Sequence, residues 1–372
     1  MSDLGEIARA IGDEYLQTRR TTPFQRKALR AIQRCRTEAM GLLLGVCENC
    51  GAERPMFRSC RNRNCPQCQA QARAAWLEAR EQELLPVPYF HVVFTVPEML
   101  NPIALYCPEV FYAALLQSAG NALLDVGLSK LKARLGCLTV LHTWGQNLSL
   151  HPHVHCVVPG GGLSADRRRW VPLRNSSYLL PIKVLSRRFR TLLCEALRRA
   201  ARNGQLQRLP NEVPPHITIE GAVAQEWIAY AKPPFGGPEQ VLEYLSRYTH
   251  RVAISNRRIV SFSENKVTFQ WRDYADSNRV KYSTIDAVEF LRRFLMHVLP
   301  ERFVRIRYFG FLANRQRTKN IECVRALIGC GVLLRFHDRP KLLLLCPTCY
   351  ARLARAPQLN KLRPPPTADQ AA

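Results

Sequence analysis

The chain has 372 residues, with 54 Lys and Arg against 29 Asp and Glu, and therefore a formal net charge of +25. Its hydrophobic content of 47% can fill a core, which excludes a wholly disordered chain. No apolar run reaches the roughly 18–20 residues that span a bilayer, so we expect no integral membrane protein. The charge predicts a polyanionic partner, most commonly nucleic acid. Acidic opening residues without a basic-then-apolar signal favour a cytoplasmic, nucleoid-associated protein.

The first part of the chain reads as helical over residues 1–46. An irregular, cysteine-rich block follows, and then a polar helix over residues 69–85 that two prolines stop. Residues 89–96 are β-branched and aromatic and predict a buried strand. The further expected elements are a helix over 108–135, strands over 138–144 and 153–158, helices over 183–202 and 238–250, a hairpin over 259–271 that turns at Glu264-Asn265, and a helix capped by Thr284 that ends at Pro300.

Fourteen cysteines without a secretory signal favour metal binding over a disulfide framework. Cys47 and Cys50 form one C-x2-C pair, and Cys65 and Cys68 form a second one 14 residues further on. Each pair can supply two corners of a tetrahedron, so we expect these four thiolates to bind one structural Zn²⁺. Cys60 lies between the pairs and can replace one ligand or remain a spare.

A third C-x2-C pair, Cys346 and Cys349, lies near the end of the chain. Cys323 and Cys330 are the nearest candidates to complete a site with it, but six residues separate them, which is not the spacing of a zinc knuckle. Both a second zinc site and uncoordinated thiols are open at this point.

The stretch Leu-His-Pro-His-Val-His-Cys-Val-Val over residues 150–158 places histidines at alternate positions. Alternate residues of a strand share a face, so His151, His153 and His155 can point the same way and bind a divalent ion. Zinc β-lactamase-like hydrolases continue this pattern as H-x-H-x-D-H, which the residues after His155 do not. A second class of enzymes uses histidine-hydrophobic-histidine to bind a metal that polarises a scissile phosphate, with tyrosine as the nucleophile.

Tyr244 and Tyr248 are spaced i, i+4 in the expected helix over 238–250, so their side chains share one face. Arg247 and Arg251 lie beside them in the sequence. Aromatic pairs at this spacing usually belong to a core. In a strongly basic chain with the histidine motif about 90 residues upstream, a nucleophilic pair becomes the better interpretation.

The order of these motifs resembles the two-tyrosine HUH transposases of rolling-circle insertion sequences, the IS91-like family. The resemblance rests on the cysteine pairs, on H-P-H-V-H-C-V-V-P-G-G-G from His151, and on Y-L-S-R-Y-T-H-R-V-A-I-S-N from Tyr244. Residues 59–68 resemble that family's zinc module, and residues 305–314 resemble a stretch near its end. The implied fold class is α+β, with an N-terminal four-cysteine zinc-binding module followed by an HUH-endonuclease domain, an antiparallel sheet flanked by helices.

The implied domain boundaries are contiguous. Residues 1–86 would hold the N-terminal helices and the zinc-binding module, and residues 87–320 the two-tyrosine catalytic domain. Residues 321–372 would form a cysteine-containing C-terminal segment with a proline-rich, disordered tail.

The resemblance also implies the activity: a transposase that nicks and rejoins single-stranded DNA at transposon ends and in target DNA. Tyr244 and Tyr248 would form the 5′-phosphotyrosine, and His153 and His155 would hold catalytic Mg²⁺ or Mn²⁺ besides the structural Zn²⁺. No ATP would be needed, in keeping with the lack of a G-x4-G-K-[ST] motif. A third metal ligand is common in such enzymes, and the candidates here are His151, Glu243 and His250.

Two other interpretations are open at the level of the sequence. The first is a plasmid replication initiator or relaxase that shares the HUH chemistry. The second is a zinc-containing DNA-binding protein whose nuclease site has decayed. The presence of both histidines and both tyrosines favours an enzyme.

Overall fold

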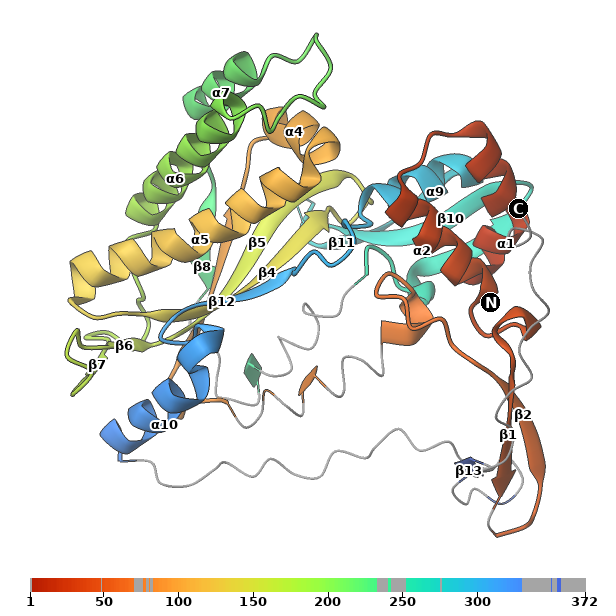
Figure 1. Cartoon of the computed structure of the whole chain (residues 1–372), viewed down its shortest axis with the longest axis horizontal. Coiled ribbons are helices and arrows are strands. Elements are labelled where there is room, and N and C mark those ends of the chain that lie inside the picture. Colours follow the sequence, from red (N-terminus) through yellow and green to blue (C-terminus); the bar gives the residue numbers. More distant parts are fainter. Residues whose placement is uncertain are drawn as a thin grey trace. The chain divides into compact units, whose positions relative to one another are not determined.

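The computed structural model describes residues 2–47, 49–69, 76–77, 80, 83–232, 240–241, 252–274, 276–329, 349 and 353–355 (Figure 1). The chain forms two compact units, and each unit combines segments that are distant in the sequence. Unit 1 comprises residues 1–73, 250–298 and 337–372, and unit 2 comprises residues 74–249 and 299–336. The span 87–320, expected as one contiguous domain, therefore contributes to both units.

Unit 2 is built on a five-stranded antiparallel sheet in the order β12-β4-β5-β3-β8. Its strands are β3 (Tyr89–Thr95), β4 (Gly136–Trp144), β5 (Leu150–Pro159), β8 (Ala229–Lys232) and β12 (Ile306–Gly310). The strands expected over 89–96, 138–144 and 153–158 are confirmed. A short hairpin of β6 (Gly161–Leu163) and β7 (Trp170–Pro172) follows β5.

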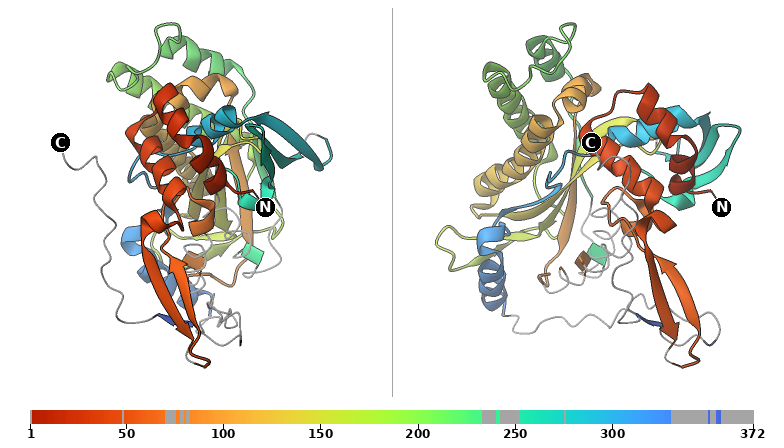
Figure 2. Two further views of the ribbon diagram at one scale, coloured as in Figure 1. Left: turned by 90° about the vertical axis from the view of Figure 1, so that its right-hand side faces the viewer. Right: turned by 45° about the vertical axis from the view of Figure 1, so that its right-hand side comes forward.

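Helices cover one face of this sheet, as Figures 1 and 2 show. They are α4 (Asn101–Tyr106), α5 (Pro108–Leu131) and α6 (Ile182–Arg202), and α7 (Pro215–Ala224) packs on α6. The helices expected over 108–135 and 183–202 are confirmed. Helix α10 (Arg317–Leu327) packs against the opposite face through Ile321 and Val324. The α+β class with an antiparallel sheet flanked by helices is confirmed.

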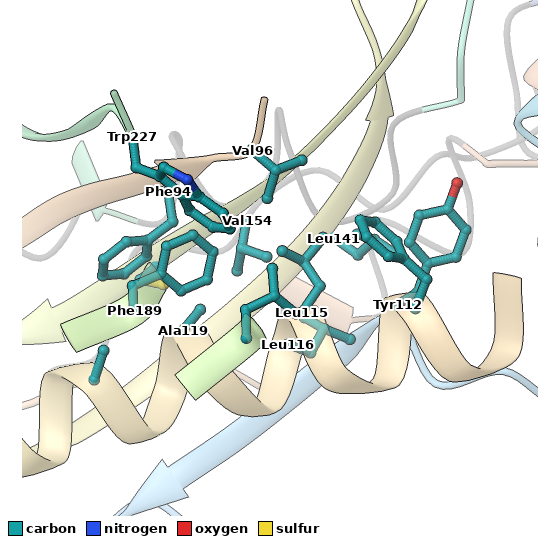
Figure 3. Packing of buried hydrophobic residues seen from close by; sticks show 14 of the residues in the cluster. Phe94, Val96, Tyr112, Leu115, Leu116, Ala119, Leu141, Val154, Phe189 and Trp227 are labelled. Atoms are coloured by element: carbon teal, nitrogen blue, oxygen red, sulfur yellow. The ribbon is translucent and has the colours of Figure 1, made fainter. Parts of the chain in front are cut away.

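Strand pleating divides the side chains of the sheet between two clusters. Phe94, Val154 and Leu141 point toward α5 and α6, where the ring of Phe94 lies 4.7 Å from that of Phe189 (Figure 3). Each such side chain, buried completely, contributes roughly 1.5–3 kcal/mol. The alternate positions point to the opposite face, and there the buried apolar residues include Tyr89, Leu138, Val140 and Val157. A residue's parity along its strand therefore fixes the face it occupies.

Unit 1 contains two three-stranded antiparallel sheets, β13-β1-β2 and β11-β10-β9. The strands are β1 (Leu42–Cys47), β2 (Glu53–Phe57), β9 (Ile259–Ser263), β10 (Lys266–Asp273), β11 (Arg279–Asp286) and β13 (Leu353–Arg355). The helices of this unit include α1 (Leu4–Thr18), α2 (Pro23–Arg34) and α9 (Ala287–Met296). Short 3-10 turns lie at Glu38–Met40, Glu98–Leu100, Asn256–Arg258 and Asn314–Gln316 across the two units.

The local predictions in unit 1 are partly right. The hairpin turns at Glu264 and Asn265, whose φ angles of 49° and 56° suit the left-handed turn of a tight hairpin. Thr284 does not cap a helix, because it lies within β11; Asp286 caps α9 by accepting hydrogen bonds from two backbone N–H groups. The helix expected over 1–46 holds for α1 and α2, but residues 42–47 form β1.

The helices expected over 69–85 and 238–250 lie largely outside the described residues. Within the described part of the chain, no helix combines the length and the apolar character needed to cross a membrane.

Candidate metal centres and catalytic site

Three histidines converge on the sheet face of unit 2 that lies opposite α5 and α6. His142 comes from β4, and His153 and His155 come from β5; one ring nitrogen of each lies within 4.8 Å of the others. Their ring centroids are 5.4 Å apart for His142 and His153, 4.5 Å for His142 and His155, and 4.8 Å for His153 and His155. The arrangement is a compact triangle of imidazoles.

Strand register explains this convergence. His142 is the direct antiparallel partner of His153, and Val140 is the partner of His155. Directly paired side chains stand about 4.5–5.5 Å apart and diagonal ones remain within reach, so His142 meets both histidines of β5. His142 shares the parity of Leu138 and Val140 along β4, and His153 and His155 share the parity of Val157 along β5, so all three lie on the same face.

Hydrogen bonds orient the imidazole rings of His153 and His155 on β5. The Nδ1–H of His153 donates to the carbonyl oxygen of His151 at 2.7 Å, which leaves the Nε2 lone pair of His153 for a metal. His155 Nδ1 lies 2.9 Å from Nε2 of His91, and the two rings stack with centroids 5.1 Å apart. If His155 binds a metal through Nε2, its Nδ1–H donates to His91.

His91 is a buried residue of β3 that the sequence interpretation had not singled out. Burial is the main reason that the pKa of His91 falls to about 3, and Lys232 and His153 act in the same direction. The imidazole of His91 is therefore neutral near pH 7 and can accept the hydrogen bond from His155.

The third histidine of the group is not the one expected from the sequence. His151 is outside the group of three, although its ring lies 5.2 Å from that of His153. Successive residues on one strand face are about 6.6–6.8 Å apart, so His151 and His155 extend away from His153 in opposite directions. His142 on the neighbouring strand, not His151, completes the group of three. Glu243 and His250 lie outside the described residues.

A second group consists of Cys35, Cys60, Cys65 and Cys68 in unit 1. Sulfur separations are 3.6 Å from Cys68 to both Cys35 and Cys60, and 3.7 Å from Cys35 to Cys65. A tetrahedral site with Zn–S bonds of about 2.3 Å has sulfurs about 3.8 Å apart, so the four side chains fit Zn²⁺. Burial raises the pKa of the Cys35 thiol to about 11, which a bound cation would reverse.

The grouping corrects the zinc prediction. Cys65 and Cys68 do not join Cys47 and Cys50 in one four-cysteine group; Cys35 and Cys60 complete their group instead. Cys47 and Cys50 belong to a different group, with Cys349. The C-x2-C spacing identified both pairs, but it carries no information on which pairs meet in the fold.

Comparison with known proteins places these sites in a family. Residues 136–320 match a family model described as "Putative transposase", and residues 7–96 match one described as "Transposase zinc-binding domain". The chain is 46% identical over 339 residues to "Putative transposase y4qJ" of Sinorhizobium fredii (strain NBRC 101917 / NGR234), covering 89% of this chain and 85% of that protein. It is 30% identical over 302 residues to the transposase for insertion sequence element IS801 of Pseudomonas savastanoi pv. phaseolicola, covering 76% and 68%.

The chain belongs to the IS91-like transposase family. No solved structure matches it significantly. The family's transposase region contains β4, β5 and all three clustered histidines, and its zinc-binding region contains the whole Cys35 group. The expected N-terminal zinc-binding domain ahead of a transposase domain is confirmed.

Sequence reasoning missed His142, His91 and Cys35. His142 and His91 each lay inside a strand that the sequence did predict, so histidines on neighbouring strands were the available signal. Cys35 had no such signal, because it stands alone at the end of α2 and belongs to no C-x2-C pair. The predicted nucleophiles Tyr244 and Tyr248 lie outside the described residues.

Proposed function

We propose that this IS91-like transposase nicks and rejoins single-stranded DNA through a 5′-phosphotyrosine intermediate and so drives rolling-circle-type transposition. The observation that carries the proposal is the convergence of His142, His153 and His155 on one face of an antiparallel sheet. Three neutral imidazoles are a suitable ligand set for a divalent ion that leaves positions open to a substrate.

The three histidines would hold Mg²⁺ or Mn²⁺. When bound, such an ion polarises the scissile phosphate and stabilises the negative charge of the transition state. His91 would orient His155 through their 2.9 Å hydrogen bond. The carbonyl oxygen of His151 would orient His153 in the same manner.

Tyr244 and Tyr248 would be the nucleophiles. Val241, three residues before Tyr244, is fully buried with Leu138 and Val140 on the histidine face of the sheet. Tyr244 and Tyr248 stand three and seven residues after Val241, a spacing that shares one face in the helix expected from the sequence over 238–250. The burial of Val241 on the histidine face supports the tyrosines of this segment as the nucleophiles.

The chemistry balances without an energy source. A phenolic oxygen attacks the scissile phosphorus, the bond from phosphorus to the 3′ oxygen breaks, and the phenolic proton is lost while the leaving oxygen becomes a 3′-hydroxyl. The tyrosine ester preserves the energy of the phosphodiester, so a second strand's 3′-hydroxyl can reverse the reaction and join. Two tyrosines allow two linked cuts, one on the donor strand and one on the target.

Single-stranded DNA is the proposed substrate, reached in the cytoplasm at the bacterial nucleoid. The net charge of +25 provides long-range attraction for the phosphate backbone. On α6, Lys183, Arg187, Arg199 and Arg202 are exposed and form part of that basic surface. Structural Zn²⁺ at the Cys35 group would order the N-terminal module, since metal binding supplies folding free energy in small modules.

The proposal is tested with labelled oligonucleotides that carry the ends of the element. Single-stranded substrate should be nicked in Mg²⁺ and its label transferred to a second strand, whereas the same sequence as a duplex should not react. A replication initiator would nick and reseal without needing two element ends. Cleavage that leaves only free 5′-phosphate ends, with no joining, would identify a hydrolase and contradict the proposal.

A further inference from the structure

The group of Cys47, Cys50 and Cys349 unites the two ends of the chain. Cys47 ends β1 and Cys50 follows in the β1–β2 turn, whereas Cys349 lies 302 residues beyond Cys47. The sulfur of Cys349 is 3.4 Å from that of Cys47 and 3.5 Å from that of Cys50. All three belong to unit 1, and none is among the cysteines of the Cys35 group.

These distances fit a metal better than a disulfide. A disulfide joins two sulfurs at about 2.05 Å, so it would not include the third cysteine of the group. The two separations from the Cys349 sulfur, 3.4 and 3.5 Å, instead approach the edge of about 3.8 Å expected for thiolates around tetrahedral zinc, and all three sulfurs lie within 4.8 Å of one another. Cys47 is fully buried and packs with Ala52 and Cys349, while Cys50 is exposed, so the group lies at the edge of the hairpin.

The backbone of the β1–β2 turn forms a knuckle around the first two cysteines. The N–H of Gly51 donates to the carbonyl oxygen of Cys47 at 2.9 Å, and the N–H of Cys47 donates to that of Ala52 at 3.0 Å. Gly51 has a φ of +69°, a left-handed conformation that glycine adopts without strain. The turn therefore presents Cys47 and Cys50 together, as a zinc knuckle requires.

Strand pairing brings the third cysteine to this knuckle. Leu353 of β13 is the antiparallel partner of Cys47, and β13 extends the β1–β2 hairpin to a three-stranded sheet. Cys349 stands four residues before that pair and belongs to the second C-x2-C motif, Cys346-Pro-Thr-Cys349. A C-x2-C turn and a further cysteine beside a three-stranded antiparallel sheet are parts found in a zinc ribbon.

We propose that Cys47, Cys50 and Cys349 bind a second zinc ion, which fastens the C-terminal segment to the N-terminal hairpin. The C-x2-C spacing of the sequence makes Cys346 the candidate for the fourth ligand. Cys346 itself lies outside the described residues. A metal that closes a loop of this length removes much of the conformational freedom of the unfolded chain. Zinc would thus complete unit 1 from both ends of the sequence.

The test is the zinc content of the full-length protein purified under reducing conditions, measured by elemental analysis. Wild type should contain about two zinc ions per chain, one for each cysteine group. Cys349→Ser and Cys346→Ser should each lower the content to about one, and adding Cys35→Ser to either should remove nearly all of it. Cys323→Ser, a change of the same type outside both groups, is the matched control and should leave the content unchanged.

A ligand-competent variant separates coordination from packing and protects the test against misfolding. Cys349→His can still offer a nitrogen to zinc and should retain about two ions, whereas Cys349→Ser should not. Replacing zinc by Co²⁺ should give the absorption of tetrahedral cobalt thiolate at both sites in wild type and at one in Cys349→Ser. The proposal would be overturned if wild-type protein contained one zinc ion per chain and neither Cys349→Ser nor Cys346→Ser lowered that content. A disulfide between Cys47 and Cys349 under these reducing conditions would also overturn it.

Discussion

His142 and His153 face each other as direct partners across β4 and β5, with ring centroids 5.4 Å apart. The pair brings a histidine from outside the histidine-hydrophobic-histidine motif into the group of three. The register also places the ring of His142 closer to that of His155, at 4.5 Å. The three candidate metal ligands thus come from two strands, and each can be tested separately.

We predict that His142→Ala abolishes Mg²⁺-dependent nicking as fully as His153→Ala or His155→Ala. Removing one group that stabilises the transition state typically costs about 100-fold or more in rate. Binding to single-stranded DNA should change little, because phosphate contacts dominate that affinity. The measurements are initial nicking rates at saturating Mg²⁺ and a salt titration of DNA binding.

His151→Ala is the matched control for these variants. Its ring is close to that of His153 but outside the group of three, and its hydrogen bond to His153 uses the backbone carbonyl, which alanine retains. The variant should nick within a few-fold of the wild-type rate. If His151→Ala abolished nicking and His142→Ala did not, the assignment of the third ligand would have to be reversed.

His91 should act on the metal site without touching the metal. His91→Phe keeps a buried ring but removes the nitrogen that lies 2.9 Å from Nδ1 of His155. Loss of such a supporting hydrogen bond typically costs about 10- to 100-fold in metal affinity or activity. Calorimetric titration with Mn²⁺ should show this weakening, and His91→Gln, which restores a hydrogen-bonding group, should recover part of it. Equal affinities in wild type and His91→Phe would rule out this role.

Cys35 should contribute as much to zinc binding as Cys65 or Cys68. The sulfur of Cys35 lies 3.6–3.7 Å from theirs, as neighbours on a tetrahedron require. Cys35→Ser should therefore lower the zinc content by about one ion per chain and lower the melting temperature, because metal binding is coupled to folding. Cys194→Ser changes a buried cysteine outside both groups and should retain the zinc. Full zinc content in Cys35→Ser would refute the four-cysteine group.

Gly310 is required at the end of β12 by backbone geometry. It has a φ of +65°, and a Cβ there would clash with the backbone carbonyl oxygen of Leu135. Gly310→Ala should destabilise the protein by about 2 kcal/mol or more, from left-handed strain and the clash together. Gly329 has a similar φ of +71° with nothing within 4 Å, so Gly329→Ala should show only the strain of about 1 kcal/mol. Equal melting temperatures for the two variants would contradict this account.

The sequence predicts unit 2 well because its signals are local. Apolar β-branched runs identified β3, β4 and β5, and helical periodicity identified α5 and α6. The tight turn at Glu264-Asn265 could be predicted for the same reason, since a short polar pair with an asparagine, which tolerates a left-handed backbone, separates two strands. The prediction that Thr284 caps a helix was wrong because threonine is common both at helix caps and in strands. Here the strand continues to Asp286, which caps the helix instead.

The sequence could not predict which distant segments of the chain pair with each other. The motif gave His153 and His155, but the choice between His151 and His142 depends on the register of β4 against β5, which no local pattern fixes. The same holds for the cysteines, where spacing identified each C-x2-C pair and the fold decided its partners. Unit 1 joins residues from both ends of the chain, and no local pattern indicates which distant segments pack together.

We expect a tyrosine, not water, to attack the DNA. After reaction with single-stranded element ends, wild-type protein should remain attached to the 5′ end of the cleaved strand through denaturing electrophoresis. Tyr244→Phe and Tyr248→Phe each delete only the attacking oxygen, so the fold should hold while transposition falls. One of the two variants can retain cleavage, because the i, i+4 spacing gives the two hydroxyls similar positions.

The decisive measurement is mass spectrometry of the adduct from wild type and from the double variant Tyr244→Phe/Tyr248→Phe. We expect the nucleotide on a peptide containing Tyr244 or Tyr248 in wild type, and no adduct in the double variant with its DNA binding and melting temperature unchanged. An adduct that persists in the double variant, or wild-type cleavage that leaves only free 5′-phosphate ends, would contradict the account.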